Sequence, residues 1–148
     1  MGYTHYWRFH KDRMTTKELR ESFKLVSEEI KQLHEALPKD IVIRGGMGEG
    51  EPIINESEIW FNGDEEKGED HETFCIEWKG EGGFSFCKTA RKPYDLLVCA
   101  SLLSFHNHFS RDVFQLSSDG SGEDWQDAVD FYNEVSSLGI NNPFKDQD

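Results

Sequence analysis

Three cationic side chains stand close together in one segment of an otherwise acidic sequence. Residues 86–95 read FCKTARKPYD, and Lys88, Arg91 and Lys92 all precede the first carboxylate, Asp95. The whole chain of 148 residues has 29 acidic and 16 basic residues, which gives a formal net charge of -13. Cations gathered in this way suit a phosphate or a carboxylate, which arginine binds in a bidentate manner and lysine binds as a point charge.

The predicted secondary structure supports that interpretation. Residues 83–89 alternate like a strand, and Pro93 is typical of the first turn of a helix. The cations would therefore lie at or just before a helix N-terminus, where unpaired amides and the helix dipole favour negative charge. The segment predicts a site for a small anionic ligand, with Arg91 and Lys88 on the anion. The alternative is that the cations only pair with neighbouring acids and belong to the scaffold.

Aromatic and polar residues from two other segments could complete such a site. In the predicted strand 2–10, Tyr6 and Arg8 share one face, and an aromatic ring beside a cation suits a nucleotide base and its phosphate. The turn SSDG at 117–120 offers hydroxyls and a carboxylate that could contact ligand hydroxyls or cap the following helix. The predicted ligand-binding residues are Tyr6, Arg8, Lys88, Thr89, Arg91, Lys92, Tyr94, Ser118 and Asp119.

Catalytic chemistry has weaker support in the sequence. His71 and Glu72 could act as an acid–base pair, with a contribution from Asp119. Cys87 next to Lys88 could have a lowered pKa, or strand alternation could bury it. No set of nucleophile, base and orienting residue stands out, so a binding protein is favoured over the alternative of a small hydrolase or transferase.

We expect neither a cofactor nor a bound metal. On a helix, the side chains of His106 and His108 would diverge. The acidic run at 64–70 does not match the spacing of an EF-hand loop. The glycine-rich run at 45–50 is followed by Pro52 and a strand-like segment, whereas a phosphate-binding glycine loop must open a helix.

The excess of acidic over basic residues limits the kinds of partner that the chain can bind. Most of the surface would repel duplex DNA and anionic membranes, so we expect no direct binding to either. An acidic surface can instead imitate a polyanion and block a basic, nucleic-acid-binding partner. That is the alternative function, with the acids at 64–70 as its candidates. Nothing in the sequence indicates an oligomeric state.

Targeting features and cysteine usage predict a cytoplasmic protein. The N-terminal segment MGYTHYWRFH lacks the apolar core of a signal peptide, and no run of residues reaches the length of a membrane span. The cysteines Cys75, Cys87 and Cys99 form no close pair and no CxxC motif. An odd number of widely spaced cysteines favours reduced, mostly buried thiols.

Hydrophobic periodicity predicts three helices and six strands. The clearest helix follows Thr15, which forms a capping box with Glu18, and it ends at Pro38. A second helix, apolar on nearly every side, spans 94–108, and a third begins after the expected N-cap Ser121. Strands are predicted at 2–10, 41–44, 57–62, 73–79, 83–89 and 112–116.

This order of elements predicts an α+β fold. Short strands on brief connectors favour an antiparallel or mixed sheet of about five or six strands, with three helices packed mainly on one face. A doubly wound parallel sheet is the alternative. Tyr3, His5 and Trp7 are expected on the core face of the first strand. We expect a single domain over residues 1–140 and a flexible C-terminal tail over 141–148.

Several stretches resemble the signatures of a family of small uncharacterised proteins encoded by bacteria and by tailed phages or prophages. They are GYTHYW near the start, HETF at 71–74, FCKTARKPYD at 86–95 and SSDG at 117–120. The resemblance runs from residue 2 to about residue 125 and does not include the loops at 45–55 and 63–70. It implies a protein that acts inside a bacterial cell, such as a phage accessory factor, and it implies no particular activity.

Overall fold

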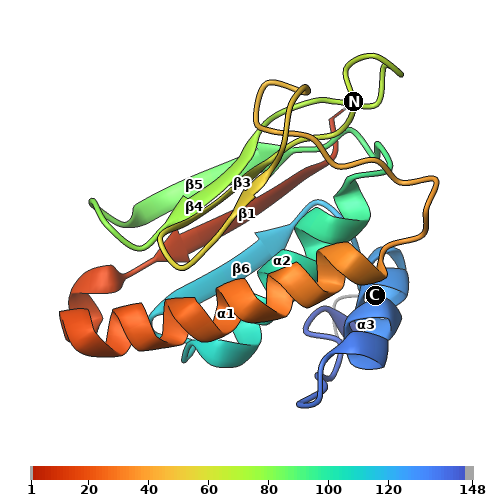
Figure 1. The fold of residues 1–148 in the computed structure, drawn as a ribbon. Helices are drawn as coiled ribbons and strands as arrows, with labels where there is room; N and C mark the ends of the chain where they lie inside the picture. The colour runs from red at the N-terminus through yellow and green to blue at the C-terminus, as the bar shows by residue number, and fades with distance from the viewer. Residues whose placement is uncertain (1, 146–148) are drawn as a thin grey trace.

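Six strands and three α-helices form an α+β fold in the computed structural model, which describes residues 2–145 (Figure 1). The strands are β1 (Thr4–Phe9), β2 (Ile53–Ile54), β3 (Glu58–Phe61), β4 (Phe74–Glu77), β5 (Gly83–Lys88) and β6 (Phe114–Ser118). The helices are α1 (Thr16–Ala36), α2 (Asp95–His108) and α3 (Gly122–Val135), and a short 3-10 helix η1 (Lys11–Arg13) follows β1. The predicted fold class is confirmed.

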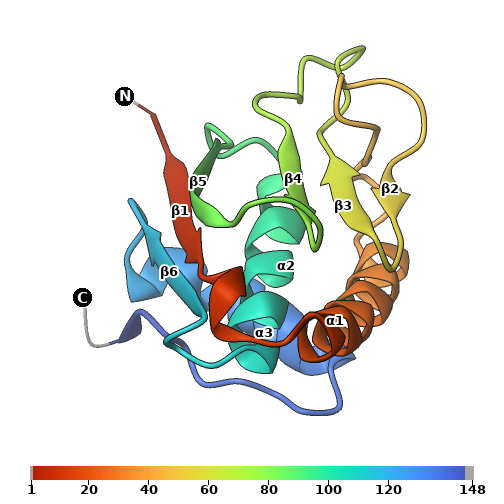
Figure 2. The ribbon, with the colours of Figure 1, turned by 90° about the vertical axis from the view of Figure 1, so that its left-hand side faces the viewer.

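The strands form two antiparallel sheets of three strands each. One sheet has the order β5-β1-β6 and the other has the order β2-β3-β4. Figure 2 shows the two sheets side by side as one arched layer, with the helices beneath it. Helix α2 packs against both α1 and α3. The helices thus cover one face of the layer, and the face of the sheet β5-β1-β6 that points away from them is open.

Helix α1 begins and buries its apolar side as the sequence predicts. The side chain of Thr15 accepts from the amide of Glu18 at 3.1 Å, and the Glu18 carboxylate accepts from the Thr15 amide at 3.3 Å. These two bonds form the predicted capping box. The side chains that repeat every three or four residues are buried against the core; they are Leu19, Phe23, Val26, Ile30 and Leu33.

Helix α2 lies in the centre of the molecule, which accounts for its apolar sequence. All residues from 97 to 105 are buried, including Ser101 and Ser104. No helix among the described residues combines the length and the apolarity needed to cross a bilayer. The first residue of α2 is Asp95, and Cys99 follows one helical turn later, so both carry polar atoms into the layer between helix and sheet.

One predicted strand differs from the structure. The segment 41–44 forms only an isolated bridge between Arg44 and Asn62. The chain turns immediately afterwards, because the amide of Gly45 donates to the carbonyls of residues 49 and 50. The strand that pairs with β3 is instead β2, which lies in the strand-like segment after Pro52.

Part of the predicted flexible tail packs on the domain. Phe144 is 1% exposed, and its ring centroid lies 4.6 Å from that of Trp125. The side-chain amide of Asn142 donates to the carbonyl of Gly122 at 2.8 Å. Residues 141–145 therefore do not form the expected tail, because an aromatic anchor holds them against α3. The remainder of that prediction, residues 146–148, lies outside the described residues.

Candidate functional site

Three segments that are far apart in the sequence meet at one end of the sheet β5-β1-β6. Strand β1 pairs with β5 on one side and with β6 on the other, and its residue His5 lies opposite Ser118. Strand β5 leads into α2, and β6 leads into α3. As a result, residues 2–7, 86–95 and 117–120 all contribute side chains to one small region between this sheet and the helices.

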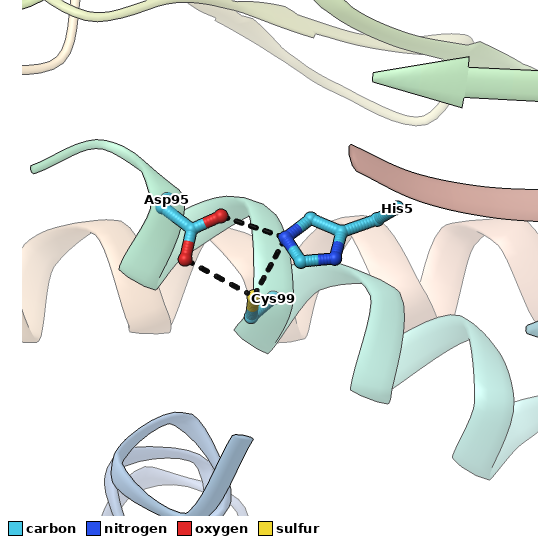
Figure 3. Close-up of side chains that lie close together, drawn as sticks. All are labelled: His5, Asp95 and Cys99. Atoms are coloured by element: carbon cyan, nitrogen blue, oxygen red, sulfur yellow. Dashed lines mark hydrogen bonds and ion pairs between the residues drawn. The ribbon is translucent and has the colours of Figure 1, made fainter. Parts of the chain in front are cut away.

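His5 is the centre of this region and is completely buried. Its Nε2 lies 2.7 Å from Oδ1 of Asp95, and its Nδ1 lies 2.7 Å from Oγ of Ser118. The hydroxyl of Thr89 donates to the same Asp95 oxygen at 2.6 Å. Figure 3 shows Sγ of Cys99 beside this pair, 3.3 Å from His5 Nε2 and 3.5 Å from Asp95 Oδ2. We call these five residues the His5 network.

The hydrogen bonds indicate which nitrogen of His5 carries the proton. An ionised carboxylate can only accept, so Nε2 donates to Asp95. In a neutral imidazole Nδ1 is then an acceptor, and the hydroxyl of Ser118 donates to it. Oγ of Ser118 in turn accepts from the amide of Gly120 at 2.9 Å. A continuous chain of hydrogen bonds therefore runs from a carboxylate through an imidazole to a hydroxyl.

The His5 network also contains the donor types of a metal site. His5 Nε2, a carboxylate oxygen of Asp95 and Sγ of Cys99 all lie within 4.8 Å of one another. A metal would need the Cys99 thiolate and a free lone pair on Nε2. Burial, and then the neighbouring Asp95 charge, raises the pKa of Cys99 well above its ordinary value. Together with the short bond from Nε2 to Asp95, this favours a proton-sharing network over a metal centre.

Arg91 lies at the edge of this region in a strained turn. Ala90 and Arg91 have φ angles of 53° and 58°, so two successive residues other than glycine occupy the left-handed region. The turn places the Arg91 guanidinium 3.9 Å from the centre of the Tyr3 ring, and its Nη1 lies 3.3 Å from Asp124. The Arg91 side chain is still 60% exposed. It is neither buried nor held by two carboxylates, so its role is not that of a fully paired scaffold cation.

The start of α2 has few donors left for an anion. The amide of Asp95 donates to the carbonyl of Lys92 at 2.9 Å, and the amide of Leu97 donates to that of Tyr94 at 3.0 Å. The carboxylate of Asp95 already lies in the first turn, where it matches the helix dipole. Nζ of Lys92 donates to the carbonyl of Gly68 at 3.1 Å.

Tyr94 and Thr89 lie inside the protein. Both are completely buried, and the Tyr94 hydroxyl donates to the carbonyl of Glu72 at 2.6 Å. Burial raises the pKa of this phenol far above its ordinary value. The carboxylate of Glu72 accepts from the amide of Lys88 at 2.7 Å, which connects the stretch at 71–74 to the same region. The Tyr94 ring is therefore enclosed by the core, and Tyr6 is the predicted tyrosine that can face a ligand.

Tyr6, Arg8 and Lys88 belong to the outer face of the sheet, which points away from the helices. Tyr6 lies opposite Phe86, and Arg8 lies opposite Phe84. Phe84 and Phe86 are 53% and 51% exposed. The Tyr6 ring stacks on Phe84 with centroids 6.1 Å apart, and the Arg8 guanidinium lies 5.1 Å from the centre of the Phe84 ring. We call Tyr6, Arg8, Phe84, Phe86 and Lys88 the aromatic face.

A hollow and a carboxylate border the aromatic face. The hollow, of about 220 Å³, is lined by β1, β5 and β6 residues that include Arg8. One oxygen of Asp119 accepts from the Tyr6 hydroxyl at 3.0 Å, and the other accepts from the amide of Thr4 at 3.1 Å. The neighbouring side chain, Ser118, points the other way, to the His5 network. The predicted site residues thus divide between the two faces of one sheet.

The residues that the sequence suggested for catalysis or metal binding lie in different surroundings. Burial, followed by the nearby Glu72, raises the pKa of Cys87 to about 12, which is the opposite of a reactive thiol. His71 is exposed. His108 lies 3.3 Å from the carboxylate of Glu29, whereas Nδ1 of His106 is buried without a hydrogen bond.

Two wider hollows lie elsewhere, around Trp78. Their volumes are about 790 and 630 Å³, and none of the predicted site residues lines them. Volume alone does not indicate a site, because binding sites also need a few convergent polar groups. The His5 network and the aromatic face supply such groups.

Sequence reasoning missed the centre of the site. Strand alternation correctly assigned His5 to the core face. A core position predicts packing, however, and gives no sign of the hydrogen bonds that His5 makes there. Asp95 and Cys99 are four residues apart, which puts them on one side of a helix, and this spacing was the only local indication that they act together. Their partner His5 is 90 residues from Asp95 along the chain, so no local pattern could join them.

No family model, no curated protein and no solved structure matches this chain. The resemblance of four short stretches to bacterial and phage-encoded proteins therefore stays a prediction. Function must be inferred from the geometry and chemistry of specific residues, because a fold does not determine it.

Proposed function

We propose that the protein binds a nucleotide, as a small anionic ligand with an aromatic base, on the aromatic face. The observation that carries the proposal is a group of exposed rings flanked by cations on a sheet without acids. The strands β1, β5 and β6 contain no Asp or Glu, although the chain has 29 such residues. An anion approaching this sheet avoids most of the negative charge that would repel it elsewhere on the surface.

Each group on the aromatic face has a distinct role in this proposal. Phe84 and Phe86 present half-exposed rings to a base, and stacking of a base on an aromatic side chain contributes about 1–3 kcal/mol. Arg8 and Lys88 bind phosphate oxygens. Asp119, at the border, accepts a hydrogen bond from a sugar hydroxyl in place of the one from Tyr6.

The separation of the two cations bears on the size of the ligand. Arg8 lies opposite Phe84, and Lys88 is four residues farther along β5. At the rise of a β-strand this separates the two positions by about 13 Å along the strand direction. A single phosphate can contact both cations only if the two long side chains turn toward each other, whereas a dinucleotide can reach both without this. We therefore expect a dinucleotide to bind more tightly than the corresponding mononucleotide.

The proposed nucleotide site lies on a different surface from the anion site that the sequence predicted at the start of α2. Lys88 belongs to both. The amides at the start of α2 are engaged, and the Asp95 carboxylate occupies the first turn. Arg91 extends over Tyr3 toward α3, on the side of the sheet that faces the helices. Arg91 is therefore not among the residues that we expect to contact the nucleotide.

Calorimetric titration with a panel of mononucleotides and dinucleotides tests the proposal. We expect binding by the native chain, and a loss of at least ten-fold in affinity for the Phe84→Ala, Phe86→Ala double variant, because stacking is removed. Leu138→Ala is the matched control, since Leu138 is 65% exposed and lies outside the aromatic face. For the charges, Arg8→Gln should weaken binding, whereas Lys31→Gln, an exposed cation on α1, should not.

Two results would contradict the proposal. One is the absence of binding across the whole panel. The other is undiminished affinity in the double phenylalanine variant, provided that its melting temperature stays close to that of the native chain. Substitutions of exposed residues usually change stability by less than about 1 kcal/mol, so the variants are expected to fold.

A further inference from the structure

The His5 network has the arrangement of an activated serine. We propose that Ser118 is a nucleophile for acyl transfer, that His5 is its general base, and that Asp95 is the residue that positions His5. The three groups are joined by two hydrogen bonds of 2.7 Å, one at each nitrogen of the imidazole. A nucleophile within hydrogen-bond reach of a base, with the base oriented by a third group, is the geometry that such chemistry needs.

The protonation pattern of the network suits this role. Nε2 donates to Asp95, so the lone pair of Nδ1 faces the hydroxyl of Ser118 and can take its proton. Asp95 is itself held in place, because it accepts from the hydroxyl of Thr89 at 2.6 Å and from the thiol of Cys99 at 3.5 Å. Both Thr89 and His5 are completely buried, which fixes the imidazole ring in one orientation.

A purely structural role accounts less well for the network. Buried ionisable pairs contribute little to the free energy of folding, since well-packed apolar residues can often replace them without loss of stability. The chain has nevertheless placed His5, Asp95 and Ser118 together from three separate elements, under the rings of Tyr3 and Trp125. Local strain occurs beside it, at Ala90 and its neighbour, and such strain is concentrated at functional sites.

The proposed reaction proceeds through an acyl-enzyme. Oγ of Ser118 attacks the carbonyl carbon of a carboxylic ester, and its proton passes to Nδ1 of His5. The imidazolium then gives that proton to the departing alkoxide, which leaves as an alcohol. Water then attacks the acyl carbon while His5 takes one proton from the water. The bond between Oγ and the acyl carbon breaks, His5 returns the proton to Oγ of Ser118, and the carboxylic acid is released.

The surroundings of Ser118 limit the substrate to a small acyl group. Ser118 is only partly exposed, at the point where β6 ends. The following turn packs closely on Tyr3: a Cβ at Gly120 would lie 2.3 Å from the Tyr3 hydroxyl oxygen. An unhindered ester such as an acetate fits these surroundings better than a bulky one. The inference does not depend on nucleotide binding, because Ser118 points away from the aromatic face.

Labelling of the full-length protein with a fluorophosphonate probe tests the inference. In that reaction Oγ of Ser118 forms a bond to phosphorus, fluoride leaves, and the hydroxyl proton passes to His5. We expect one adduct per chain by intact mass, located at Ser118 by peptide mapping. Ser118→Ala should not be labelled, whereas Ser117→Ala, its exposed neighbour in β6, should be labelled like the native chain.

Two further measurements distinguish serine chemistry from thiol chemistry and from metal binding. Asp95→Asn keeps the shape of the side chain but removes the charge that fixes the tautomer, so the labelling rate should fall on the order of 100-fold or more while the protein stays folded by circular dichroism. Cys75→Ser removes the exposed cysteine, which lies outside the His5 network. Neither this variant nor added EDTA should change the rate, because the proposed reaction uses neither a thiolate nor a metal.

Several outcomes would overturn the inference. The native protein could give no adduct, or the adduct could be found at another serine. Asp95→Asn could be labelled as fast as the native chain. Loss of labelling with EDTA would show that the cluster of His5, Asp95 and Cys99 acts as a metal site instead, and loss of labelling in Cys75→Ser would show that a thiol reacts with the probe.

Discussion

Glu29 is a carboxylate that the folded chain holds in its ionised form. Its oxygens accept hydrogen bonds from Ser104 at 2.8 Å, from Ser136 at 2.9 Å, from His108 at 3.3 Å, and from the hydroxyl of Tyr132. Burial alone would raise the pKa of this group. The hydrogen bonds outweigh burial and lower the pKa of Glu29 from 4.5 to about 2.

This lowered pKa predicts a specific acid sensitivity. Between pH 4.5 and about 2 the unfolded chain binds the proton at Glu29 more readily than the folded chain does. The stability that Glu29 contributes is thus fully present above pH 4.5 and is lost as the pH falls toward 2. Glu29→Gln should lower the free energy of unfolding at neutral pH by up to about 3 kcal/mol, and it should make stability less dependent on acid.

Urea denaturation at pH 7, 4.5 and 3 checks that expectation. Glu28→Gln is the matched control, because Glu28 is an exposed neighbour on α1. If the Glu29 variant lost as much stability between pH 4.5 and 3 as the native chain, the carboxylate would not be the group that titrates.

Single residues also show how far the sequence could predict the site. Strand alternation is a local property, and it correctly assigned Tyr6 and Arg8 to the face opposite Tyr3 and His5. Phe84 and Phe86 share the outer face with Tyr6, yet they were not named as site residues, because the pairing of β1 with β5 had to be known first. Contacts between distant segments were therefore the part that the sequence could not supply.

The helix termini are elements whose stability can be tested directly. Helix α1 and helix α3 both begin with a capping box, at Thr15 with Glu18 and at Ser121 with Asp124. Thr15→Ala should lower the free energy of unfolding by about 1 kcal/mol, because the amide of Glu18 loses its acceptor. Thr16→Ala, the same change one residue later, should not destabilise, because Thr16 is the first residue inside α1 and alanine has the higher helix propensity. Thermal or urea unfolding of both variants measures the difference, and equal stability of the two would contradict the assigned cap.

Elements differ in how well local patterns identify them. The capping box at Thr15 and the apolar repeat of α1 are local, and they predicted that helix correctly. The segment 41–44 has the composition of a strand, but pairing requires a partner, and β3 pairs with β2 instead. The left-handed pair at Ala90 and Arg91 was also unexpected, because no glycine marks it.

At the scale of the whole molecule, net charge should govern the response to salt. A charge of -13 on a small domain repels itself, and salt screens that repulsion over distances of about 8–10 Å. Raising NaCl from 10 to 200 mM at pH 7.5 should therefore raise the melting temperature. Near the sequence pI of about 4.8 the same addition should have little effect. A melting temperature at pH 7.5 that does not rise with salt would show that self-repulsion is unimportant.

The acidic loop at 64–70 belongs partly to the scaffold of the molecule. Asp64 is buried, and its carboxylate lies 3.5 Å from Arg44. A role of this surface in blocking a basic partner stays a prediction. Any test of it should neutralise the exposed Glu65 and Glu66 and leave Asp64 in place, because the loss of a buried acid would destabilise the loop itself.

The sheet β5-β1-β6 has the helices on one face and solvent on the other. This arrangement supports the proposal that its outer face binds a nucleotide. NMR titration of the protein, labelled with ¹³C in its aromatic side chains, tests this claim most directly. With a dinucleotide we predict ring-current shifts at Tyr6, Phe84 and Phe86, and none at the buried Phe105. Shifts confined to Tyr3 and other residues near Arg91, or no shifts at saturating ligand, would contradict it.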